Sequence, residues 1–521
     1  MKIKHLLFVA LLAASCCRYS ADITVYPRET AQTIEHFGAS DAWNGQFVGA
    51  WWNEDAKESI AEKLFSTDFD ENGNPKGIGL SLWRANLGAG SLEREGADII
   101  PFQNRAECYL DADGNYDWNK CRGMEYFIQK ATERGAQILL FSNSPLVRWT
   151  LNGKGHTDLK DRANLKPESY PAFAGYLADV ACHLRDKGYD IRYISPINEP
   201  SVDWVRTTQE GSSWRRSEIV KMTAALDSAM SLHGELDDVK IYLSEAASLA
   251  EAYGPTEGIG KQFGEIEDRP DNIIPTLYNP RSEYSVLGFR HVEPVIGIHE
   301  YHSNKTFSEM REKRAKLDSC LRQNGVIYHM SEWCLLSTYR NKVEGFPEQI
   351  DDYLGDINVA LLIGRMMHAD FAWCAATSWS YWKAMDSRLG ALIHLTNGEN
   401  VYQSAEAEPQ KIFWGIGNFS FFVRPGYRFV NTEGGDDLGG VCATSFISPC
   451  GKRLVTVFVN TGAEDAVKTL DLGAAFNRRL GKASTYVTSA EYDLQLVSGL
   501  VKKQGSITVP ARSLVTLVVD R

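Results

Sequence analysis

Two glutamates, each at the end of an apolar segment, are the residues best placed to do chemistry in this chain. Glu199 directly follows Ile191–Asn198, and Glu332 ends Val326–Glu332. If both segments are parallel strands of one closed sheet, the two carboxyl groups meet at its carboxyl-terminal face. Two opposed carboxyl groups can cleave a glycosidic bond, because one protonates the leaving oxygen while the other attacks or stabilises the anomeric carbon. Either glutamate alone is more often a salt-bridge or rim residue, so the hypothesis depends on the pair.

Asn198 directly precedes Glu199, and a regular strand would send these two side chains to opposite faces. Both reach one site only if the chain bends there. Pro196 and Pro200 cannot take part in a regular strand ladder, so they favour such a bend. Asn198 would then hydrogen-bond the 2-hydroxyl of a sugar, a contact that strengthens in the transition state of glycosidic cleavage.

Other residues at the ends of predicted strands would surround the two carboxyl groups. Arg84 is the expected partner of Glu332, since a guanidinium holds a carboxylate ionised through charge-assisted hydrogen bonds. Trp204, Trp379 and Trp382 would present flat apolar rings that suit stacking on the C–H faces of sugars. For each tryptophan taken alone, packing at the rim of the fold is an equally good interpretation.

The sequence His-Glu-Tyr-His at residues 299–302 resembles a set of metal ligands. Strand alternation places His299 and Glu300 on opposite faces, however, and no His-Glu-x-x-His spacing is present. We therefore predict no metal, and hydrolysis by water implies no other cofactor. His299 itself has two interpretations, a site residue or a hydrogen-bonded core histidine, and both stay open.

Eight short apolar segments alternate with helix-period segments and would position these residues. They recur at intervals of roughly 30–60 residues, as the strands of β–α units do. Eight parallel strands with intervening helices predict an α/β fold, a closed (β/α)8 TIM barrel, over residues 34–424. The predicted strands are Ile34–Ala39, Ile78–Ala85, Gln137–Asn143, Ile191–Asn198, Val239–Ser244, Val295–Tyr301, Val326–Glu332 and Ala372–Trp379.

The pattern changes after Arg424-Pro425-Gly426. Short strand-like segments follow one another between turn residues without a long helical stripe, which predicts a C-terminal β-sandwich over residues 425–521. Residues 22–33, before the barrel, also have strand character and are a candidate to join the sandwich. No Gly/Ser-rich linker separates the two domains, so we expect them to be docked. The predicted strands are Leu454–Val459, Val467–Leu472, Ala483–Thr488, Ser506–Val509 and Ser513–Val519.

Several motifs resemble those of glycoside hydrolase family 30. Asn198-Glu199-Pro200 and Ser331-Glu332-Trp333 are similar to the two catalytic motifs of the retaining clan with (β/α)8 barrels. The resemblance covers essentially the whole mature chain. The marks that narrow it to the family are His36-Phe37-Gly38-Ala39-Ser40, Ser142-Asn143-Ser144-Pro145, Gly417-Asn418-Phe419-Ser420 and Arg424-Pro425-Gly426-Tyr427.

The resemblance implies that Glu199 is the acid/base and Glu332 the nucleophile, with Tyr301 in contact with the nucleophile and Asn143 in the substrate site. Within the family the chain looks most like the endo-β-1,6-galactanase-like branch, which implies a polysaccharide or oligosaccharide substrate. β-1,6-Glucan, xylan and a glucosyl lipid are alternative substrates. A non-catalytic surface protein that binds glycans is an alternative of another class, but both carboxyl groups and Asn198 argue against it.

The composition excludes other classes of protein. The 521 residues include 55 Lys+Arg and 67 Asp+Glu, a net charge of −12 that disfavours binding to nucleic acid and to anionic membranes. No apolar run reaches the ~18 residues that a membrane span requires. We expect a monomer.

The apolar segment Leu6–Ser15, which follows two lysines, is typical of a secretory signal. Cys16 follows Ala-Ser, as at a lipoprotein cleavage site, and would then carry a lipid anchor; cleavage near Ala21 is the alternative. Both cleavage sites predict export of the chain, to the periplasm, the cell surface or the medium. Eight cysteines follow Cys17, and an oxidising compartment permits disulfides between them without this large domain requiring any.

Overall fold

The structure is a computed structural model, and it describes residues 21–93, 98–255, 263, 268–335, 343–346, 356–387, 390–396 and 406–521. The predicted signal segment with Cys16 lies outside the described residues, apart from residue 21. Within the described ranges, no helix is both long enough and apolar enough to span a membrane. The eight cysteines beyond Cys17 are all free thiols.

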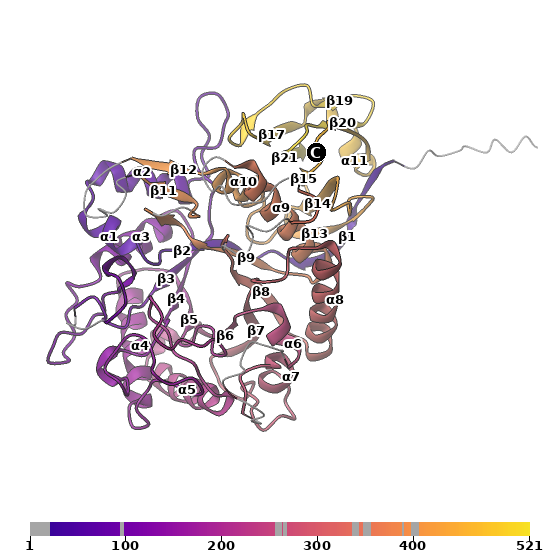
Figure 1. Ribbon diagram of the computed structural model, residues 1–521. Helices are drawn as coiled ribbons and strands as arrows, with labels where there is room; N and C mark the ends of the chain where they lie inside the picture. Colours follow the sequence, from indigo (N-terminus) through magenta and orange to yellow (C-terminus); the bar gives the residue numbers. More distant parts are fainter. Residues whose placement is uncertain are drawn as a thin grey trace, which may run out of the picture.

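Eight parallel strands close into a barrel, which confirms the predicted fold class. Each strand pairs with the next, and the last pairs with the first to complete the ring that Figure 1 shows at the centre of the molecule. In order the strands are β2 (His36–Ser40), β3 (Leu82–Asn86), β4 (Gln137–Phe141), β5 (Ile191–Ser195), β6 (Lys240–Ala246), β7 (Val292–His299), β8 (Ile327–Glu332) and β9 (Ser378–Lys383).

Helices cover the outside of the barrel (Figure 1), and buried apolar residues of these helices belong to the barrel core. In α4 (Tyr170–Asp186), Phe173, Leu177 and Leu184 are fully buried at helical spacing. The helix stops before Gly188, whose φ of +87° is a left-handed conformation that favours glycine. The other helices of this part are α1 (Gly45–Trp51), α2 (Glu54–Phe65), α3 (Arg122–Glu133), α5 (Arg216–Met230), α6 (Leu249–Tyr253), α7 (Ile273–Leu277), α8 (Phe307–Asn324) and α9 (Ile357–Trp373).

The last barrel strand lies later in the chain than the sequence predicts. The predicted strand Ala372–Trp379 begins inside α9, and β9 starts at Ser378. Helix α9 contacts the C-terminal sheet and belongs to the barrel core, so it is buried on nearly all sides and lacks a polar stripe. An apolar run of this kind does not distinguish a buried helix from a buried strand.

The C-terminal part forms a ten-stranded sheet in the order β18-β17-β21-β15-β14-β13-β1-β16-β20-β19. Strand β1 (Ile23–Thr33) pairs with β13 and β16, so the segment before the barrel lies within this sheet. The other strands are β13 (Arg428–Glu433), β14 (Val441–Ile447), β15 (Arg453–Asn460), β16 (Ala466–Asp471), β17 (Ser484–Thr488), β18 (Gln495–Leu496), β19 (Val501–Lys502), β20 (Ser506–Val509) and β21 (Ser513–Asp520). The sequence missed β13 and β14, whose polar and small residues hide the strand pattern, and it also missed the two-residue strands β18 and β19.

Both faces of the sheet are buried, and one of them packs against the barrel. One face, including Phe446 and Leu514, joins the barrel core where α9 and α10 (Lys411–Ser420) pack against it. The other face encloses a separate hydrophobic cluster that includes Phe458 and Leu517. A minor three-stranded sheet precedes α10 and consists of β10 (Met385–Asp386), β11 (Ile393–Leu395) and β12 (Ala407–Pro409).

Candidate active site

A pocket of about 340 Å³ opens at the carboxyl-terminal ends of the barrel strands. Its walls come from residues that end or follow six of the eight strands, the arrangement in which barrel enzymes build active sites. The lining residues are Asn143, Asn198, Glu199, Val202, Trp204, Gln209, Ala247, Tyr301, His302, Glu332, Cys334 and Trp382.

The chain bends between β5 and the first glutamate, as the prolines predict. Strand β5 ends at Ser195, and Glu199 has a φ of +43°, in the left-handed region. The backbone N–H of Glu199 donates a 3.0 Å hydrogen bond to the carbonyl oxygen of Glu245, at the end of the neighbouring strand β6. Because of this bend, both Asn198 and Glu199 line the pocket.

Glu332 is held by one hydrogen bond at each carboxylate oxygen. Arg84 Nη1 lies 2.9 Å from Oε2, and the Tyr301 hydroxyl donates to Oε1 at 2.9 Å. The expected contacts of Arg84 and Tyr301 with Glu332 are therefore present. One oxygen atom of Glu199 and one of Glu332 lie within 4.8 Å of each other, so the two carboxyl groups face one another in the pocket.

Arg84 connects three groups of the site. Besides Glu332, its Nη2 donates to Asn198 Oδ1 at 2.9 Å and to Glu245 Oε2 at 2.6 Å. Its guanidinium stacks 3.6 Å from the centre of the Phe141 ring, and only 1% of the side chain is exposed. Stacking and hydrogen bonds together fix a planar guanidinium in one orientation.

His299 belongs to the site, which decides between its two interpretations. Its Nδ1 lies 2.8 Å from Glu199 Oε1 and 3.4 Å from Glu332 Oε1, and its Nε2 lies 3.3 Å from Glu245 Oε2. Burial works to lower the pKa of His299, but the surrounding carboxylates outweigh it and raise the pKa to about 10. His299 is therefore an imidazolium at neutral pH.

Glu245 is a third carboxyl group of the site that the sequence did not reveal. Besides its contacts with Arg84 and His299, it accepts a 2.5 Å hydrogen bond from the Ser195 hydroxyl. Burial works to raise its pKa, but Arg84, His299 and the Ser195 hydrogen bond hold it below the usual range, so Glu245 is ionised. The available signal was its place directly after the predicted strand Val239–Ser244, which matches the place of Glu199 after its own strand.

The comparisons with known proteins identify the family. The model of O-glycosyl hydrolase family 30 matches residues 20–389. This chain belongs to O-glycosyl hydrolase family 30. An endo-β-1,6-galactanase of Hypocrea rufa is 25% identical over an alignment of 482 residues, which covers 88% of this chain and 85% of that protein.

Two solved structures share the fold of this chain. A conserved exported protein from Bacteroides fragilis is 31% identical, with a TM-score of 0.86 over 95% of this chain and 100% of the other. A family 30 endoxylanase from Clostridium papyrosolvens C71 shares the fold with a TM-score of 0.64 and 17% identity, covering 96% of this chain and 100% of the other. The family match and the curated relative make the chain an O-glycosyl hydrolase, and its catalytic residues are to be sought in this pocket.

The charges in the pocket of this family 30 hydrolase are closely balanced. Burial raises the pKa of Glu332 above its usual range, although His299 and Arg84 pull it down. The neighbouring carboxyl group of Glu199 also raises the pKa of Glu332. The site thus contains two cations, Arg84 and His299. They face three carboxyl groups, those of Glu199, Glu245 and Glu332, so one proton on a carboxyl group makes the site neutral.

The tryptophans of the hydrolase divide into two groups. Trp204 and Trp382 line the pocket, and the Trp204 indole N–H donates to the carbonyl oxygen of Glu199 at 3.1 Å. Trp379 was expected at the site but does not line the pocket: its side chain is fully buried, and its N–H donates to Asp370 at 3.0 Å. The reason is alternation along β9, which points Trp379 outward to α9.

Asn143 and the His-Glu-Tyr-His sequence at residues 299–302, for which we predicted no metal, complete the comparison with the sequence. Asn143 lines the pocket and donates to Asn86 Oδ1 at 3.3 Å. Glu300 points away from His299 and pairs with buried Arg314, as alternation predicts. Glu199, His299 and Glu332 offer three ligand atoms within 4.8 Å, but both ring nitrogens of His299 already contact carboxylates, those of Glu199 and Glu245.

Proposed function

We propose that this hydrolase is a retaining endo-β-1,6-galactanase that works by double displacement. Glu332 attacks the anomeric carbon while Glu199 protonates the leaving oxygen, and Glu199 then activates the water that releases the sugar from Glu332. The observation that carries the proposal is the pair of facing carboxyl groups, with oxygen atoms within 4.8 Å. Retaining enzymes place their carboxyl groups about 5–5.5 Å apart, whereas inverting enzymes leave about 6.5–9.5 Å for a water molecule.

The contacts of each glutamate suit its proposed role. Arg84 and Tyr301 orient the two oxygens of Glu332, so an attacking lone pair is aimed before substrate binds. When Glu332 forms its ester it loses its charge, and Arg84 keeps Glu245 as a partner. Glu199 is held by Nδ1 of His299 at 2.8 Å and faces Glu332 across the pocket, as the acid/base role requires.

The preferred substrate is supported by the relative from Hypocrea rufa, which is an endo-β-1,6-galactanase. Xylan, β-1,6-glucan and a glucosyl lipid are the competing substrates of the same reaction class. A protein that only binds glycans would gain nothing from three carboxyl groups buried side by side, because each costs free energy to desolvate. The hydrolase interpretation of the pocket is therefore the stronger one.

The proposal is tested by product analysis on a panel of glycans. The wild-type chain and the Glu332→Gln variant are incubated with β-1,6-galactan, β-1,6-glucan and xylan, and products are separated by size. We expect a ladder of β-1,6-galactooligosaccharides from the wild type alone, with glycan binding retained by the variant. Monosaccharide as the first product would overturn endo action, and turnover by Glu332→Gln would overturn the nucleophile assignment.

Glu251→Gln is the matched control for loss of a buried glutamate. Glu251 lies near Glu199 but does not line the pocket, and its side chain accepts a hydrogen bond from Ser201 at 2.6 Å. Burial raises the pKa of Glu251 to about 8, so a neutral amide resembles the form present at neutral pH. We expect this variant to keep wild-type activity.

We also propose that the chain is exported and monomeric. The segment Leu6–Ser15 supports export, and a solved relative from Bacteroides fragilis is itself an exported protein. Mass spectrometry of the mature amino terminus distinguishes a lipid-modified Cys16 from cleavage near Ala21. An unprocessed Met1 would contradict export, and light scattering of the purified chain tests the monomer.

A further inference from the structure

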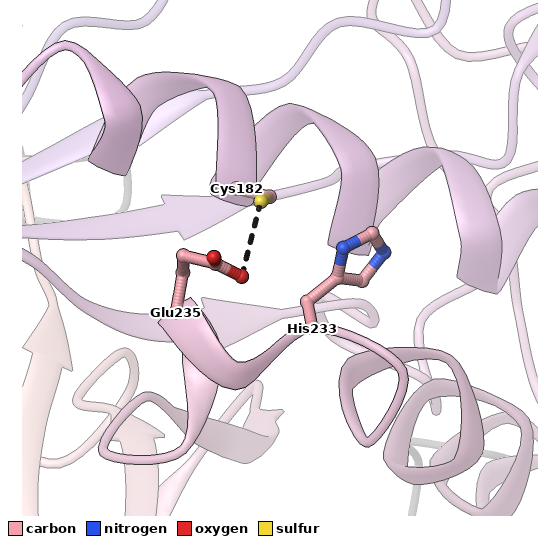
Figure 2. Close-up of side chains that lie close together, drawn as sticks. All are labelled: Cys182, His233 and Glu235. Atoms are coloured by element: carbon pink, nitrogen blue, oxygen red, sulfur yellow. Dashed lines mark hydrogen bonds between the residues drawn. The ribbon is translucent and has the colours of Figure 1, made fainter.

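A second cluster of ligand-forming side chains lies on the barrel, away from the pocket. Cys182 on α4 faces His233 and Glu235, which come from the segment between α5 and β6 (Figure 2). One ligand atom of each residue lies within 4.8 Å of the other two. We propose that these three residues bind a zinc-type divalent metal ion.

The cluster is on the face of the barrel opposite the active site. Helix α4 ends at Asp186 and leads into the beginning of β5 at Ile191, so Cys182 lies near the amino-terminal end of that strand. The segment with His233 leads into the beginning of β6 at Lys240. Residues at this face of a barrel support stability, whereas catalytic residues come from the carboxyl-terminal ends of the strands.

The donor atoms are those that zinc selects. A cysteine sulfur, a histidine nitrogen and a carboxylate oxygen all bind Zn²⁺, and three protein ligands leave a fourth position for water. Ligands of a tetrahedral zinc ion lie roughly 3.5 Å apart, so donor atoms within 4.8 Å need only small side-chain rotations to close around an ion. Cys182 Sγ is already 3.9 Å from Glu235 Oε2.

The orientation of His233 is an independent indication of metal binding. Its Nε2 lies 3.2 Å from Asp179 Oδ1, and Figure 2 shows the other ring nitrogen on the side of Cys182. Asp179 is itself held by the Tyr116 hydroxyl at 2.6 Å. A carboxylate that accepts the second N–H of a histidine fixes its tautomer and leaves the remaining nitrogen free to bind a metal.

The charge of the cluster also favours a cation. Asp179 and Asp186 lie three and four residues from Cys182 along α4, so both are on the same side of the helix as the thiol. Within the described part of the chain, Glu235 forms no ion pair with a lysine or arginine. When a metal ion binds, the thiol releases its proton to solvent, and the thiolate, imidazole and carboxylate then share the positive charge.

The expected role of the ion is structural. It would join α4 to the segment before β6, two elements that connect to neighbouring barrel strands. An ion that binds only the folded chain raises the melting temperature of the protein, and this increase grows with the ion concentration. The proposal does not depend on the glycan substrate, and its failure would leave the proposed function untouched.

The test uses cobalt as a coloured probe for zinc. The purified full chain is stripped with a chelator, dialysed and titrated with Co²⁺, and Zn²⁺ is then added in competition. We expect one equivalent of Co²⁺ to produce a thiolate-to-cobalt charge-transfer band that Zn²⁺ abolishes. Asp179→Asn should weaken binding about 10–100-fold, as loss of a carboxylate behind a ligating histidine does.

Cysteine variants identify the site. Cys182→Ser should lose the band, whereas Cys320→Ser on α8 and Cys334→Ser in the active-site pocket should keep it. His233→Gln provides a second loss-of-ligand variant, and circular dichroism checks that each variant folds. The proposal is overturned if the wild type gives no band or if the band survives in Cys182→Ser, because another thiolate would then be the ligand.

Discussion

The Glu245 carboxylate lies 2.6 Å from the guanidinium of Arg84, and 0% and 1% of the two side chains are exposed. Arg84 also contacts Glu332, so one buried cation is shared between a glutamate of the reacting pair and a glutamate that does not line the pocket. The orientation of the proposed nucleophile thus depends on a residue that does not touch substrate.

Glu245→Gln should therefore damage both the fold and the reaction. Loss of one partner from a buried ion pair destabilises a protein by about 3–5 kcal/mol, because the other charge stays buried. We expect a loss of this size in the free energy of unfolding by denaturant, together with a fall in kcat. Glu245→Asp, which keeps the charge, should recover part of kcat; equal loss in both variants would contradict the charge argument.

The stability of the protein should depend on the protonation of His299. Its pKa is raised from 6.5 to about 10 in the folded chain, so its contribution is complete below pH 6.5 and is lost as the pH rises toward 10. Relative to His299→Gln, the wild type should lose unfolding free energy across this window, with a slope of up to about 1.4 kcal/mol per pH unit. Denaturant unfolding of both proteins at a series of pH values measures this slope. A difference between the two proteins that does not change with pH would contradict the assignment.

The two groups of tryptophans should respond differently to substitution. Trp382→Ala removes a wall of the pocket and should raise KM, by about 2- to 13-fold if the ring contributes the ~0.5–1.5 kcal/mol typical of aromatic contacts. Trp379→Phe removes the donor to buried Asp370 and part of a fully buried ring, so it should cost at least about 1–3 kcal/mol of stability and leave KM unchanged. Steady-state kinetics and thermal unfolding of both variants separate these effects, and a raised KM in Trp379→Phe would refute the division.

The acid/base role of Glu199 predicts chemical rescue. In Glu199→Ala the leaving group is not protonated, so kcat on a natural glycan should fall about 10²–10⁴-fold. An aryl glycoside with a good leaving group needs no acid and should still form the glycosyl–enzyme. Added azide should then release it as the β-glycosyl azide, detected by mass spectrometry and NMR. Absence of rescue on the activated substrate would count against Glu199 as acid/base.

Much of the fold could be predicted, because the spacing of the strands and the apolar faces of most helices are visible in the sequence. The barrel strands that carry Glu199 and Glu332 were located, and the bend at Asn198 followed from the proline positions. The position of β9 could not be predicted, since the preceding α9 is apolar on nearly every side. Burial removes the polar stripe that marks most helices.

The site was predicted less completely than the fold. The contacts of Arg84 and Tyr301 with Glu332 depend on strand order alone, which the barrel supplies. Glu245 could not be assigned in the same way, because its role comes from contacts with residues about 50–160 positions away in sequence. Trp379 was misplaced because a shift of one position along a strand reverses the face to which a side chain points.

The anomeric configuration of the first product tests the central claim most directly. The wild-type enzyme is mixed with a β-1,6-linked galactooligosaccharide, and proton NMR spectra follow the newly formed reducing end before mutarotation. Double displacement through Glu332 predicts that the β-anomer appears first and the α-anomer only later. Initial release of the α-anomer would show inversion and contradict the proposed roles of Glu199 and Glu332.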